Sequence, residues 1–561
     1  MNTILTTRDA LDRRADDDHV GLMFEDRSWT WAHVVAECRR RAHLLRSLHD
    51  EGRPFHVGVM LENEPEYLFM IAAAAYAAAT VVGVNLTRRG EELARDIRFT
   101  DVEILVTTSA LLAHLDGVDV GIDPSRILLV DEASYAGLLA GHGDERPDVP
   151  AAGDPTTQLL LMFTSGSTGA PKAVVCSTGR MARTIAIGHM GVTRDDVPYN
   201  CMPLFHGNAL FACWAPAVNV GAAFAMARRF SASRFVDDLR RFGVTYFNYV
   251  GRALAYILAQ PEREDERRTA LRACFGTEAS ETDRREFHRR FGVWPTESYG
   301  SSEGGLAIMR TPDTPAEALG LPPSGMPAVV MDRETLTECP RVVFDEHGLP
   351  RNEEEATGEL ANLMGARSFE GYYKNPEAFA ERVHGDIFFS GDLGYRDEAG
   401  YFYFAGRGSD RLRVDSENFS AGPVERILGR FDGVDLALVY AVADERTGDQ
   451  VMAALQMRDP CVFDADRFAL FLSEQPDLGT KWAPRYVRLV TEVPVTATGK
   501  VDKPRLRRDG WDVEDPVYYR PAAALDYVLL DDALRAAIAQ RFARSERRHL
   551  LPTGSVRVAA S

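Results

Sequence analysis

Lysine is scarce in this chain of 561 residues, whose 64 basic residues include only five lysines. Arginine is therefore the default cation, and a retained lysine suits a position that needs a compact point charge. Two of the five, Lys172 and Lys500, end short loops rich in glycine and hydroxyl groups, TSGSTGAPK from Thr164 and TATGK from Thr496. Such loops present N–H groups and hydroxyls to phosphate oxygens. The sequence predicts two anion-binding loops, and the alternative is two solvated surface lysines.

Cysteine is also sparse and shows no arrangement typical of a metal site or a redox pair. The seven cysteines are widely scattered, with no CxxC pattern and no pairing with histidine at metal-ligand spacing. This usage favours a reducing compartment, so we expect a cytoplasmic protein. The formal charge of −19 disfavours a general grip on nucleic acid, which requires a basic face. Any bound nucleotide should therefore be small.

Long apolar runs are missing as well. The longest, from Leu68 to Val84, falls short of the roughly 20 residues that a membrane helix needs. It predicts a buried helix that leads into a strand, with Asn63 as the helix cap and Pro65 in the first turn. The N-terminal residues have no apolar core of signal-peptide length, so secretion is not expected. An arginine-rich helix near the C-terminus would give at most peripheral membrane contact.

Helical and strand patterns alternate through the first 150 residues, which predicts an α/β sheet. The clearest helix begins at a Thr30 cap and ends at Leu48. Strands are expected at 56–61, 102–108 and 126–132, where apolar and β-branched residues dominate. The apolar run before Thr164 predicts a further strand that leads into the first lysine loop.

The second half of the chain predicts smaller parts. Proline, glycine and short β-like runs in residues 321–405 indicate a β subdomain. The polar, densely charged segment 405–420 has the composition of a hinge, and the residues beyond it suffice for a small α+β domain. We therefore predict an N-terminal domain at 1–406, a hinge at 407–412, a mobile C-terminal domain at 413–510, and an extension with a loose tail at 511–561.

Neither lysine loop is a Walker A motif, because GxxxxGK[ST] requires a glycine five residues before the GK pair. A P-loop NTPase is therefore disfavoured. The segment from Gly300 to Gly304 satisfies GxSxG, the nucleophile elbow of serine hydrolases, with Ser302 as the nucleophile. That alternative requires a helix directly after the serine and leaves both lysine loops unexplained. A catalytically silent binding protein is a third alternative.

Five segments occur in the order and spacing of the adenylate-forming superfamily. They are the loop ending in Lys172, the segment 299–304 (YGSSEG), the segment 390–393 (SGDL), Gly406-Arg407, and the loop ending in Lys500. The chain thus resembles acyl-CoA synthetases, luciferases and nonribosomal adenylation domains.

Further segments narrow the resemblance to one branch. Residues 201–210, 275–280, 417–420 and the DPVYYRP tail are most similar to the fatty-acid transport protein and very-long-chain acyl-CoA synthetase branch, particularly its actinobacterial relatives. The resemblance implies an α/β fold: a large N-terminal adenylate-forming domain, with α/β sheets and a β subdomain, joined to a small mobile α+β domain.

The resemblance implies an ATP-dependent acyl-CoA ligase that uses ATP, Mg²⁺ and coenzyme A. Such an enzyme activates a fatty or aryl carboxylic acid as acyl-AMP, releases pyrophosphate and transfers the acyl group to CoA. Positive charge must offset repulsion between the carboxylate and the α-phosphate. The alternative is an adenylate-forming enzyme of secondary metabolism, which would use a carrier protein as acceptor or activate nitrite to diazotise an aryl amine. A homodimer is possible.

The resemblance also assigns roles to single residues. Lys500 would bridge the carboxylate and the α-phosphate, and Glu303 would be the catalytic Mg²⁺ partner. Tyr299 would stack on adenine, and Asp392 would grip the ribose with Arg407 close by. The alternatives without a functional role are a solvated loop carboxylate for Glu303, a core-packing residue for Tyr299 and a turn cap for Asp392.

The other implied residues bind ATP, line the substrate tunnel or form the hinge. His206 would lie near the acyl and thiol tunnel, although a core histidine is nearly as good an interpretation. Rotation between the two half-reactions would occur about Ser409 and Asp410. The remaining ATP-binding residues are Thr164, Ser165, Gly166, Ser167, Thr168, Gly169, Lys172, Gly276, Thr277, Glu278, Ala279, Gly300 and Ser302.

Overall fold

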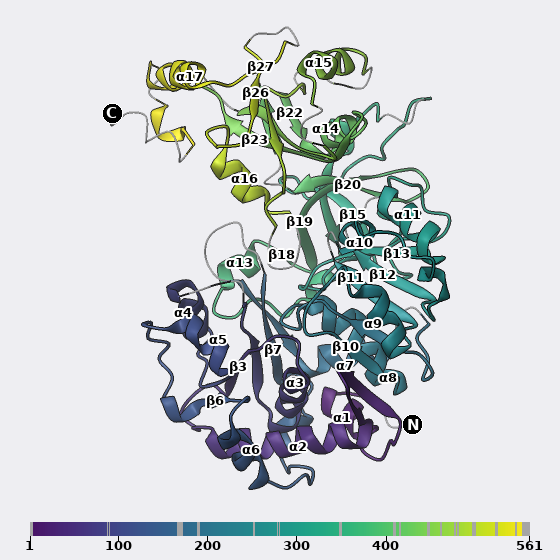
Figure 1. Ribbon diagram of the computed structural model, residues 1–561, viewed down its shortest axis with the longest axis vertical. Coiled ribbons are helices and arrows are strands. Elements are labelled where there is room, and N and C mark those ends of the chain that lie inside the picture. The colour runs from purple at the N-terminus through teal and green to yellow at the C-terminus, as the bar shows by residue number, and fades with distance from the viewer. Residues whose placement is uncertain are drawn as a thin grey trace. The chain divides into compact units, whose positions relative to one another are not determined.

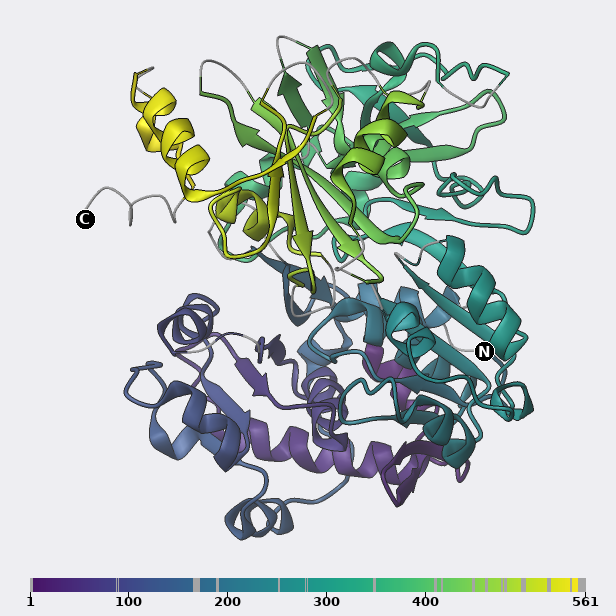
Figure 2. The same ribbon diagram turned by 45° about the horizontal axis from the view of Figure 1, so that its top comes forward.

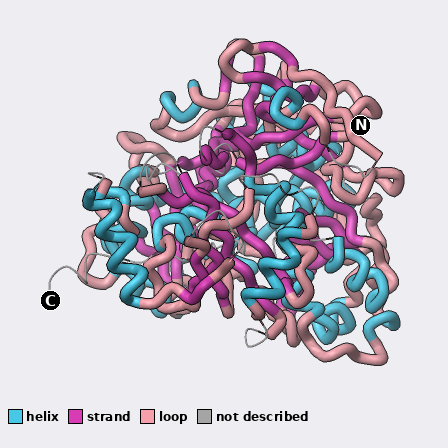
Figure 3. The backbone as a smooth tube through the Cα atoms, turned by 90° about the horizontal axis from the view of Figure 1, so that it is seen from above, coloured by secondary structure: helices cyan, strands magenta, loops and turns pink. Residues whose placement is uncertain are grey.

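The structure is a computed structural model. It describes residues 4–86, 88, 90–164, 172–187, 191–250, 253–277, 279, 281–346, 350–407, 411–414, 417–445, 449–459, 463–475, 478, 482–495, 501–521, 526–544 and 547–552. The described residues of 1–311 and 364–388 form one compact unit, here unit 1, and those of 312–363 and 389–552 form unit 2. Helices and strands are interleaved throughout the described chain (Figure 3). The predicted α/β class is confirmed.

The first sheet of unit 1 has six described strands in the order β6-β5-β3-β4-β7-β8. Neighbouring strands are parallel except β7 and β8. Strands β3, β4 and β5 are buried along their whole length, as parallel strands covered on both faces are. The strands are β3 (His56–Met60), β4 (Thr80–Gly83), β5 (Ile104–Thr107), β6 (Ile127–Leu129), β7 (Gln158–Thr164) and β8 (Lys172–Ser177).

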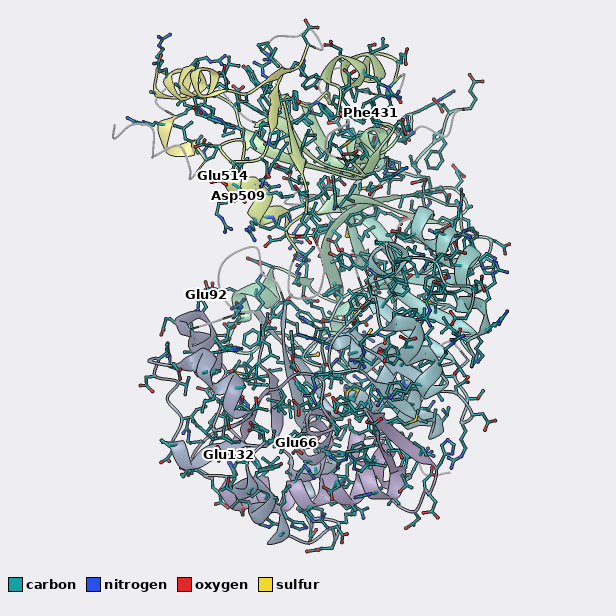
Figure 4. The ribbon with its side chains drawn as sticks, viewed as in Figure 1. Glu66, Glu92, Glu132, Phe431, Asp509 and Glu514 are labelled. Atoms are coloured by element: carbon teal, nitrogen blue, oxygen red, sulfur yellow. The ribbon has the colours of Figure 1, made fainter. Side chains whose placement is uncertain are left out.

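Helices α2 (Trp31–Leu48) and α3 (Pro65–Ala77) accompany this sheet, and α2 is the long purple helix of Figure 2. The Thr30 hydroxyl accepts the His33 N–H, which confirms the predicted cap of α2. Helix α3 is buried all round from Tyr67 onward, as its alanine-rich sequence predicts. At its start Glu66, labelled in Figure 4, accepts two 2.6 Å hydrogen bonds from Arg41 of α2. The bidentate pair ties the two helices together.

The predicted cap of α3 is wrong. Glu64 occupies the cap position without a side-chain cap bond, and Pro65 is in the first turn as expected. Asn63 instead makes tertiary contacts, donating to the Met202 carbonyl at 3.1 Å and accepting the Leu204 N–H at 3.0 Å. Its amide therefore fastens the loop before α3 to the loop after a strand of the second sheet.

The second sheet of unit 1 has eight described strands in the order β14-β13-β12-β11-β9-β10-β1-β2. From β13 to β1 all neighbours are parallel, so the carboxyl ends of these strands share one edge, where α/β proteins commonly bind ligands. The strands are β1 (Val20–Phe24), β2 (Arg27–Thr30), β9 (Pro198–Asn200), β10 (Phe224–Met226), β11 (Tyr246–Val250), β12 (Ala273–Thr277), β13 (Pro295–Gly300) and β14 (Ala307–Met309).

The remaining helices of unit 1 connect these strands or flank the sheets. A π-helix at Ala209–Trp214 follows β9, and π-helical turns are frequent near functional sites. Strand β18 (Val383–His384) pairs with the first two residues of β19. The helices are α1 (Thr7–Asp12), α4 (Gly90–Phe99), α5 (Ser109–Leu112), α6 (Ala133–Ala140), α7 (Thr178–Ile187), α8 (Ala215–Val220), α9 (Phe235–Phe242), α10 (Ala253–Leu258), α11 (Glu281–Phe291) and α13 (Pro376–Ala380).

Unit 2 contains most of the segment predicted as a β subdomain and the segment predicted as an α+β domain. In the subdomain β15, β17 and β19 are successive neighbours, with β16 beside β15 and β20 beside β19. A hairpin, β21-β22, and a five-stranded sheet in the order β23-β24-β25-β26-β27 follow. The strands are β15 (Ala328–Asp332), β16 (Thr337–Glu338), β17 (Gly358–Asn362), β19 (Ile387–Arg396), β20 (Phe402–Arg407), β21 (Arg411–Val414), β22 (Glu417–Ser420), β23 (Val434–Ala443), β24 (Asp449–Met457), β25 (Tyr486–Val490), β26 (Val517–Tyr519) and β27 (Val528–Leu529).

Helices and aromatic side chains complete unit 2. Phe431, labelled in Figure 4, packs edge to face on Phe468 with ring centroids 5.1 Å apart. Trp511, Ile538 and Phe542 of the C-terminal extension are buried in one hydrophobic cluster with residues of β23 and β25, so this part of the extension belongs to the core. The helices are α12 (Glu353–Ala356), α14 (Ala421–Leu428), α15 (Ala465–Ser473), α16 (Lys503–Asp509) and α17 (Asp532–Arg544).

Hinge residues Ser409 and Asp410 lie outside the described residues, and the predicted domain boundaries stay predictions. None of the helices within the described part of the chain combines the length and the apolar composition that crossing a bilayer requires.

Candidate active site

The loop that ends in Lys172 joins two antiparallel strands. Thr164 closes β7, Lys172 opens β8, and the two are Cα partners across the hairpin. The predicted loop residues Ser165, Gly166, Ser167, Thr168 and Gly169 lie outside the described residues. A Walker A loop leads into a helix, whereas this loop leads into a strand, so the geometry agrees with the sequence in excluding a P-loop NTPase.

Lys172 is nearly buried, with 8% of its surface exposed, and its charge is balanced by a carboxylate. Its Nζ lies 3.3 Å from Oε2 of Glu381, whose side chain is 61% exposed. The Nζ is also 5.9 Å from the centroid of the Tyr372 ring. A phosphate that displaced Glu381 would keep Lys172 paired, and the released carboxylate would return to water. This environment favours the anion-binding interpretation of Lys172 over a solvated surface lysine.

Glu303 lies in the turn between β13 and β14, only 8% exposed, and Oε1 accepts a 2.7 Å hydrogen bond from the Tyr372 hydroxyl. It is therefore not the solvated loop carboxylate of the alternative interpretation. Gly304 has φ +73°, and a Cβ there would lie 2.6 Å from Nη2 of Arg180. A Cβ at Gly305 would overlap the Phe388 ring. Both glycines are thus required for the chain to turn at Glu303.

The same turn rules out the serine hydrolase alternative. Ser302 is half-buried, and its carbonyl oxygen accepts a hydrogen bond from Arg180. The chain after Ser302 enters β14, which runs antiparallel to β13, whereas a nucleophile elbow continues into a helix. Ser302 does not occupy the strand-to-helix turn that the hydrolase mechanism needs.

The predicted adenine residues end neighbouring strands. Gly276 and Thr277 close β12, Tyr299 lies near the end of β13, and these strands are parallel neighbours, labelled side by side in Figure 1. Ala279 follows β12, Gly300 is the exposed last residue of β13, and Glu278 lies outside the described residues. Tyr299 is half-buried, so it is not simple core filler.

A carboxylate that the sequence analysis missed organises this edge. Oε1 of Glu297 accepts the Ala279 N–H at 2.6 Å and the Tyr249 hydroxyl at 3.0 Å. Burial raises the pKa of Glu297 above its usual value. A Cβ at Gly276 would lie 2.5 Å from the buried ring of Tyr249, so that position requires glycine. The available signal was spacing, since Glu297 and Tyr299 are two residues apart on one strand and share a face.

The predicted ribose residues belong to unit 2. Asp392 of β19 and Arg407 of β20 are Cα partners across the antiparallel ladder. Gly391, at φ +79°, donates its N–H to Glu359 at 2.6 Å and so fixes the turn before Asp392. The Arg407 side chain and all of Lys500 lie outside the described residues. The structure therefore brings Asp392 and Arg407 together at the level of the backbone.

His206 is half-buried at the loop that precedes the π-helix. Its ring packs on Phe205, with centroids 4.5 Å apart, and the backbone N–H of His206 donates to the Pro203 carbonyl at 3.1 Å. Two residues further along the chain, Oδ1 of Asn208 accepts a hydrogen bond from fully buried Asn248. A half-buried imidazole on the loop before the π-helix is compatible with a tunnel position, and that role stays a prediction.

The donor chemistry around Glu303 fits Mg²⁺. Mg²⁺ is usually held by one or two carboxylates together with water and substrate phosphates. Glu303 supplies one such carboxylate on the edge of the site that also holds Lys172, linked to it through Tyr372. Within the described ranges, no group of three or more His, Cys, Asp or Glu is placed to hold a metal ion by itself.

Comparison with known proteins places the chain in a family. Residues 8–373 match the model of the AMP-binding enzyme family. The steroid-22-oyl-CoA synthetase of Rhodococcus jostii (strain RHA1) is 48% identical over 544 residues, 96% of this chain and 97% of that protein. The medium/long-chain-fatty-acid–CoA ligase FadD17 of Mycobacterium marinum is 43% identical over 501 residues, 89% of this chain and 95% of that protein.

Solved structures agree on the fold. ATP-bound MatB from Rhodopseudomonas palustris superposes with a TM-score of 0.76 at 23% identity, covering 90% of this chain and 98% of that one.

The chain belongs to the AMP-binding enzyme family. The predicted adenylate-forming fold and acyl-CoA synthetase branch are confirmed. So is the predicted activity, an ATP-dependent acyl-CoA ligase that uses ATP, Mg²⁺, CoA and a carboxylic acid. The relatives do not favour the secondary-metabolism alternative.

Proposed function

We propose that this ligase activates a carboxylic acid on a bulky hydrocarbon skeleton, with a steroid that bears a C22 carboxyl group as the first candidate. The observation that supports this class is the 48% identity to a steroid-22-oyl-CoA synthetase along nearly the whole of both chains. A medium- or long-chain fatty acid is the second candidate, supported by the 43% identity to FadD17.

The acyl group is proposed to bind near the carboxyl ends of β9 and β11. Trp214 and Tyr249 are fully buried in the core and act as packing, whereas Asn208 and Met309 are half-buried and are available to contact a substrate. The π-helix that starts at Ala209 widens the backbone next to Asn208. Substrate contacts are therefore proposed for His206, Asn208 and Met309.

The phosphates are proposed to bind at Lys172, exchanging with its exposed partner Glu381. Glu303 would hold Mg²⁺, which when bound neutralises phosphate charge. Lys500 would place a cation between the carboxylate and the α-phosphate during adenylation and leave for the thioester step. Charge placed where the transition state develops it is commonly worth 100- to 1000-fold in rate, on the order of 3–4 kcal/mol.

Nucleoside-binding roles are proposed for residues of each unit, taken separately. Tyr299 would stack on adenine beside Gly276, Thr277 and Ala279, supported by their place on neighbouring strand ends. Asp392 and Arg407 would bind the ribose, supported by their cross-strand pairing.

A substrate panel tests the proposal. Pyrophosphate release and CoA-thioester formation would be measured with a C22 steroid acid, palmitate, benzoate and nitrite, each with and without CoA. We expect the steroid acid to give a kcat/KM at least tenfold above that of palmitate, with thioester formed only when CoA is present. A tenfold preference for palmitate would reverse the order of the two candidates. Preference for benzoate or nitrite would contradict both.

The setting of the enzyme is also proposed. We infer a cytoplasmic location, at most peripheral membrane contact, no nucleic-acid partner and a homodimeric state. The charge of −19 supports the exclusion of nucleic acid. Sedimentation equilibrium would detect the dimer, and a monomer at micromolar concentration would refute it.

A further inference from the structure

We propose that Tyr372 is a positioning residue that orients the Glu303 carboxylate for Mg²⁺ while its ring supports Lys172. The inference rests on the proposed roles of Glu303 and Lys172, and it assigns a function to a residue outside every motif of the sequence analysis. Tyr372 lies about 200 residues from Lys172 along the chain and contacts both functional groups.

The backbone around Tyr372 is held against β8. The Val175 N–H donates to the Gly371 carbonyl at 3.0 Å, and the Tyr373 N–H donates to the Ala173 carbonyl at 2.8 Å. Val174 and Tyr372 form an antiparallel bridge. The segment thus extends the sheet at the strand that begins with Lys172, which fixes Tyr372 beside that lysine.

A second anchor holds the same segment. Glu370 accepts hydrogen bonds from the Ser177 N–H at 2.5 Å and from the Ser177 hydroxyl at 2.6 Å, at the far end of β8. Tyr372 therefore sits on a backbone that is bonded to β8 along its length, and its side chain has little freedom to move, since it is only 6% exposed.

The side chain of Tyr372 contacts two functional groups, and its hydroxyl also interacts with the Arg382 side chain. Its hydroxyl donates to Oε1 of Glu303 at 2.7 Å, and its ring centroid lies 5.9 Å from Nζ of Lys172. A carboxylate has about four lone-pair positions, so Glu303 can accept this bond and still coordinate a cation. A cation within about 6 Å of an aromatic ring is stabilised by it.

The contribution of a hydrogen-bond partner of a metal ligand to metal affinity has a known magnitude. Losing one typically weakens metal binding about 10- to 100-fold, because the ligand is no longer held in its binding orientation. Phenylalanine at position 372 would remove only the hydroxyl and keep the ring beneath Lys172. The metal and the nucleotide should therefore respond differently to this single change.

The neighbouring residue is a matched control. The Tyr373 hydroxyl also donates to a carboxylate, Asp101, at 2.6 Å, but it contacts neither Lys172 nor Glu303 in any described interaction. Tyr373→Phe removes a bond of the same kind from the same segment. Any effect specific to Tyr372→Phe then reflects position, not a general loss of stability.

The experiment compares Tyr372→Phe, Tyr373→Phe and Glu303→Gln. Binding of Mn²⁺ in the presence of a non-hydrolysable ATP analogue would be titrated by electron paramagnetic resonance, and analogue binding without metal by calorimetry. We expect Tyr372→Phe to weaken Mn²⁺ binding about 10- to 100-fold. Metal-free analogue binding and the Tyr373→Phe protein should stay within twofold of wild type.

Failure of the inference and failure of the proposed function give different results. If Glu303→Gln binds Mn²⁺ as wild type does, the proposed role of Glu303 is wrong, and the inference falls with it. If Glu303→Gln loses the metal but Tyr372→Phe behaves like Tyr373→Phe, Tyr372 does not orient the carboxylate. The Tyr372→Phe/Glu303→Gln double variant should bind no more weakly than Glu303→Gln alone; a further loss would mean that the hydroxyl acts elsewhere.

Discussion

Replacing Glu297 tests how the edge beneath the predicted adenine residues is held. Oε1 of Glu297 accepts two hydrogen bonds, from the Ala279 N–H and from the Tyr249 hydroxyl. Glutamine can present a carbonyl oxygen in the same place, so Glu297→Gln removes the charge and keeps both acceptor contacts. Glu297→Ala removes both. An unsatisfied buried donor costs about 1–3 kcal/mol, and Tyr249 is fully buried, so we expect Glu297→Ala to destabilise the protein by about 2–4 kcal/mol.

Glu297 makes the stability of the folded protein depend on pH, and the sign of this dependence can be worked out. Burial raises the pKa of Glu297 above its usual 4.5, so the folded protein holds the proton more tightly than the unfolded chain. Below pH 4.5 both states are protonated and the effect is absent. As the pH rises from 4.5 through the folded-state pKa, stability falls, by about 1.4 kcal/mol for each tenfold difference in proton affinity. Glu297→Gln lacks this fall and should equal or exceed wild type in stability at pH 8.

Urea unfolding midpoints of wild type and both variants between pH 4.5 and 8, with KM for ATP, measure these effects. We expect the difference between Glu297→Gln and wild type to widen as the pH rises. KM for ATP should increase about tenfold in Glu297→Ala, because Ala279 loses its anchor, and stay within twofold in Glu297→Gln. If Glu297→Gln is as unstable as Glu297→Ala at pH 8, the charge itself is required and the reasoning fails.

Three further outcomes are expected. Lys500→Ala should slow acyl-adenylate formation at least about 100-fold yet preserve thioester formation from supplied acyl-adenylate, and Lys503→Ala should change neither beyond twofold; equal loss of both half-reactions would contradict this. Burial alone would raise the pKa of Asp196, but hydrogen bonds from Arg272, Thr193 and Thr245 hold it well below its usual value. The stability that these bonds contribute is present above pH 3.8 and is lost as the pH falls further. Asp196→Asn should lower the free energy of unfolding at pH 7 by about 2–4 kcal/mol in urea titrations. Gly276→Ala should displace the ring of Tyr249 and raise KM for ATP more than KM for CoA in steady-state assays. An equal rise in both KM values would indicate general damage to the fold.

Elements encoded locally were predictable from the sequence. Helix α2 was found from its Thr30 cap and ends at Leu48 as expected, and β3 and β5 follow their apolar runs closely. Family motifs also pointed to Lys172 and Glu303, whose roles stay predictions, and the structure links these two residues through Tyr372. In both cases the signal lies within a few consecutive residues.

Contacts between distant segments were not predictable. The sequence around Asn63 is typical of a helix cap. Its side-chain amide instead makes hydrogen bonds to the backbone of Met202 and Leu204, about 140 residues away, and no local pattern indicates this. Tyr372 and Glu381 reach Lys172 from about 200 residues away for the same reason. These side chains reach Lys172 only when the segment around Tyr372 pairs with β8 in the folded protein.

The ion pair between Lys172 and the exposed Glu381 has a consequence for affinity if Lys172 binds phosphate as proposed. ATP would then compete with a tethered anion whose local concentration never changes. Its apparent affinity would equal its intrinsic affinity multiplied by the fraction of enzyme in which the Glu381 carboxylate has left Lys172. An ion pair between two exposed side chains contributes at most about 1 kcal/mol, which would reduce the affinity about fivefold. The Lys172 side chain is only 10% exposed, so the reduction here should be at least of that order. Salt screens charges that face water, so moderate ionic strength would weaken the competition from the exposed Glu381. Salt would also weaken the attraction between ATP and the protein. The two effects oppose each other, so ATP affinity should vary less with salt than the charge of ATP suggests.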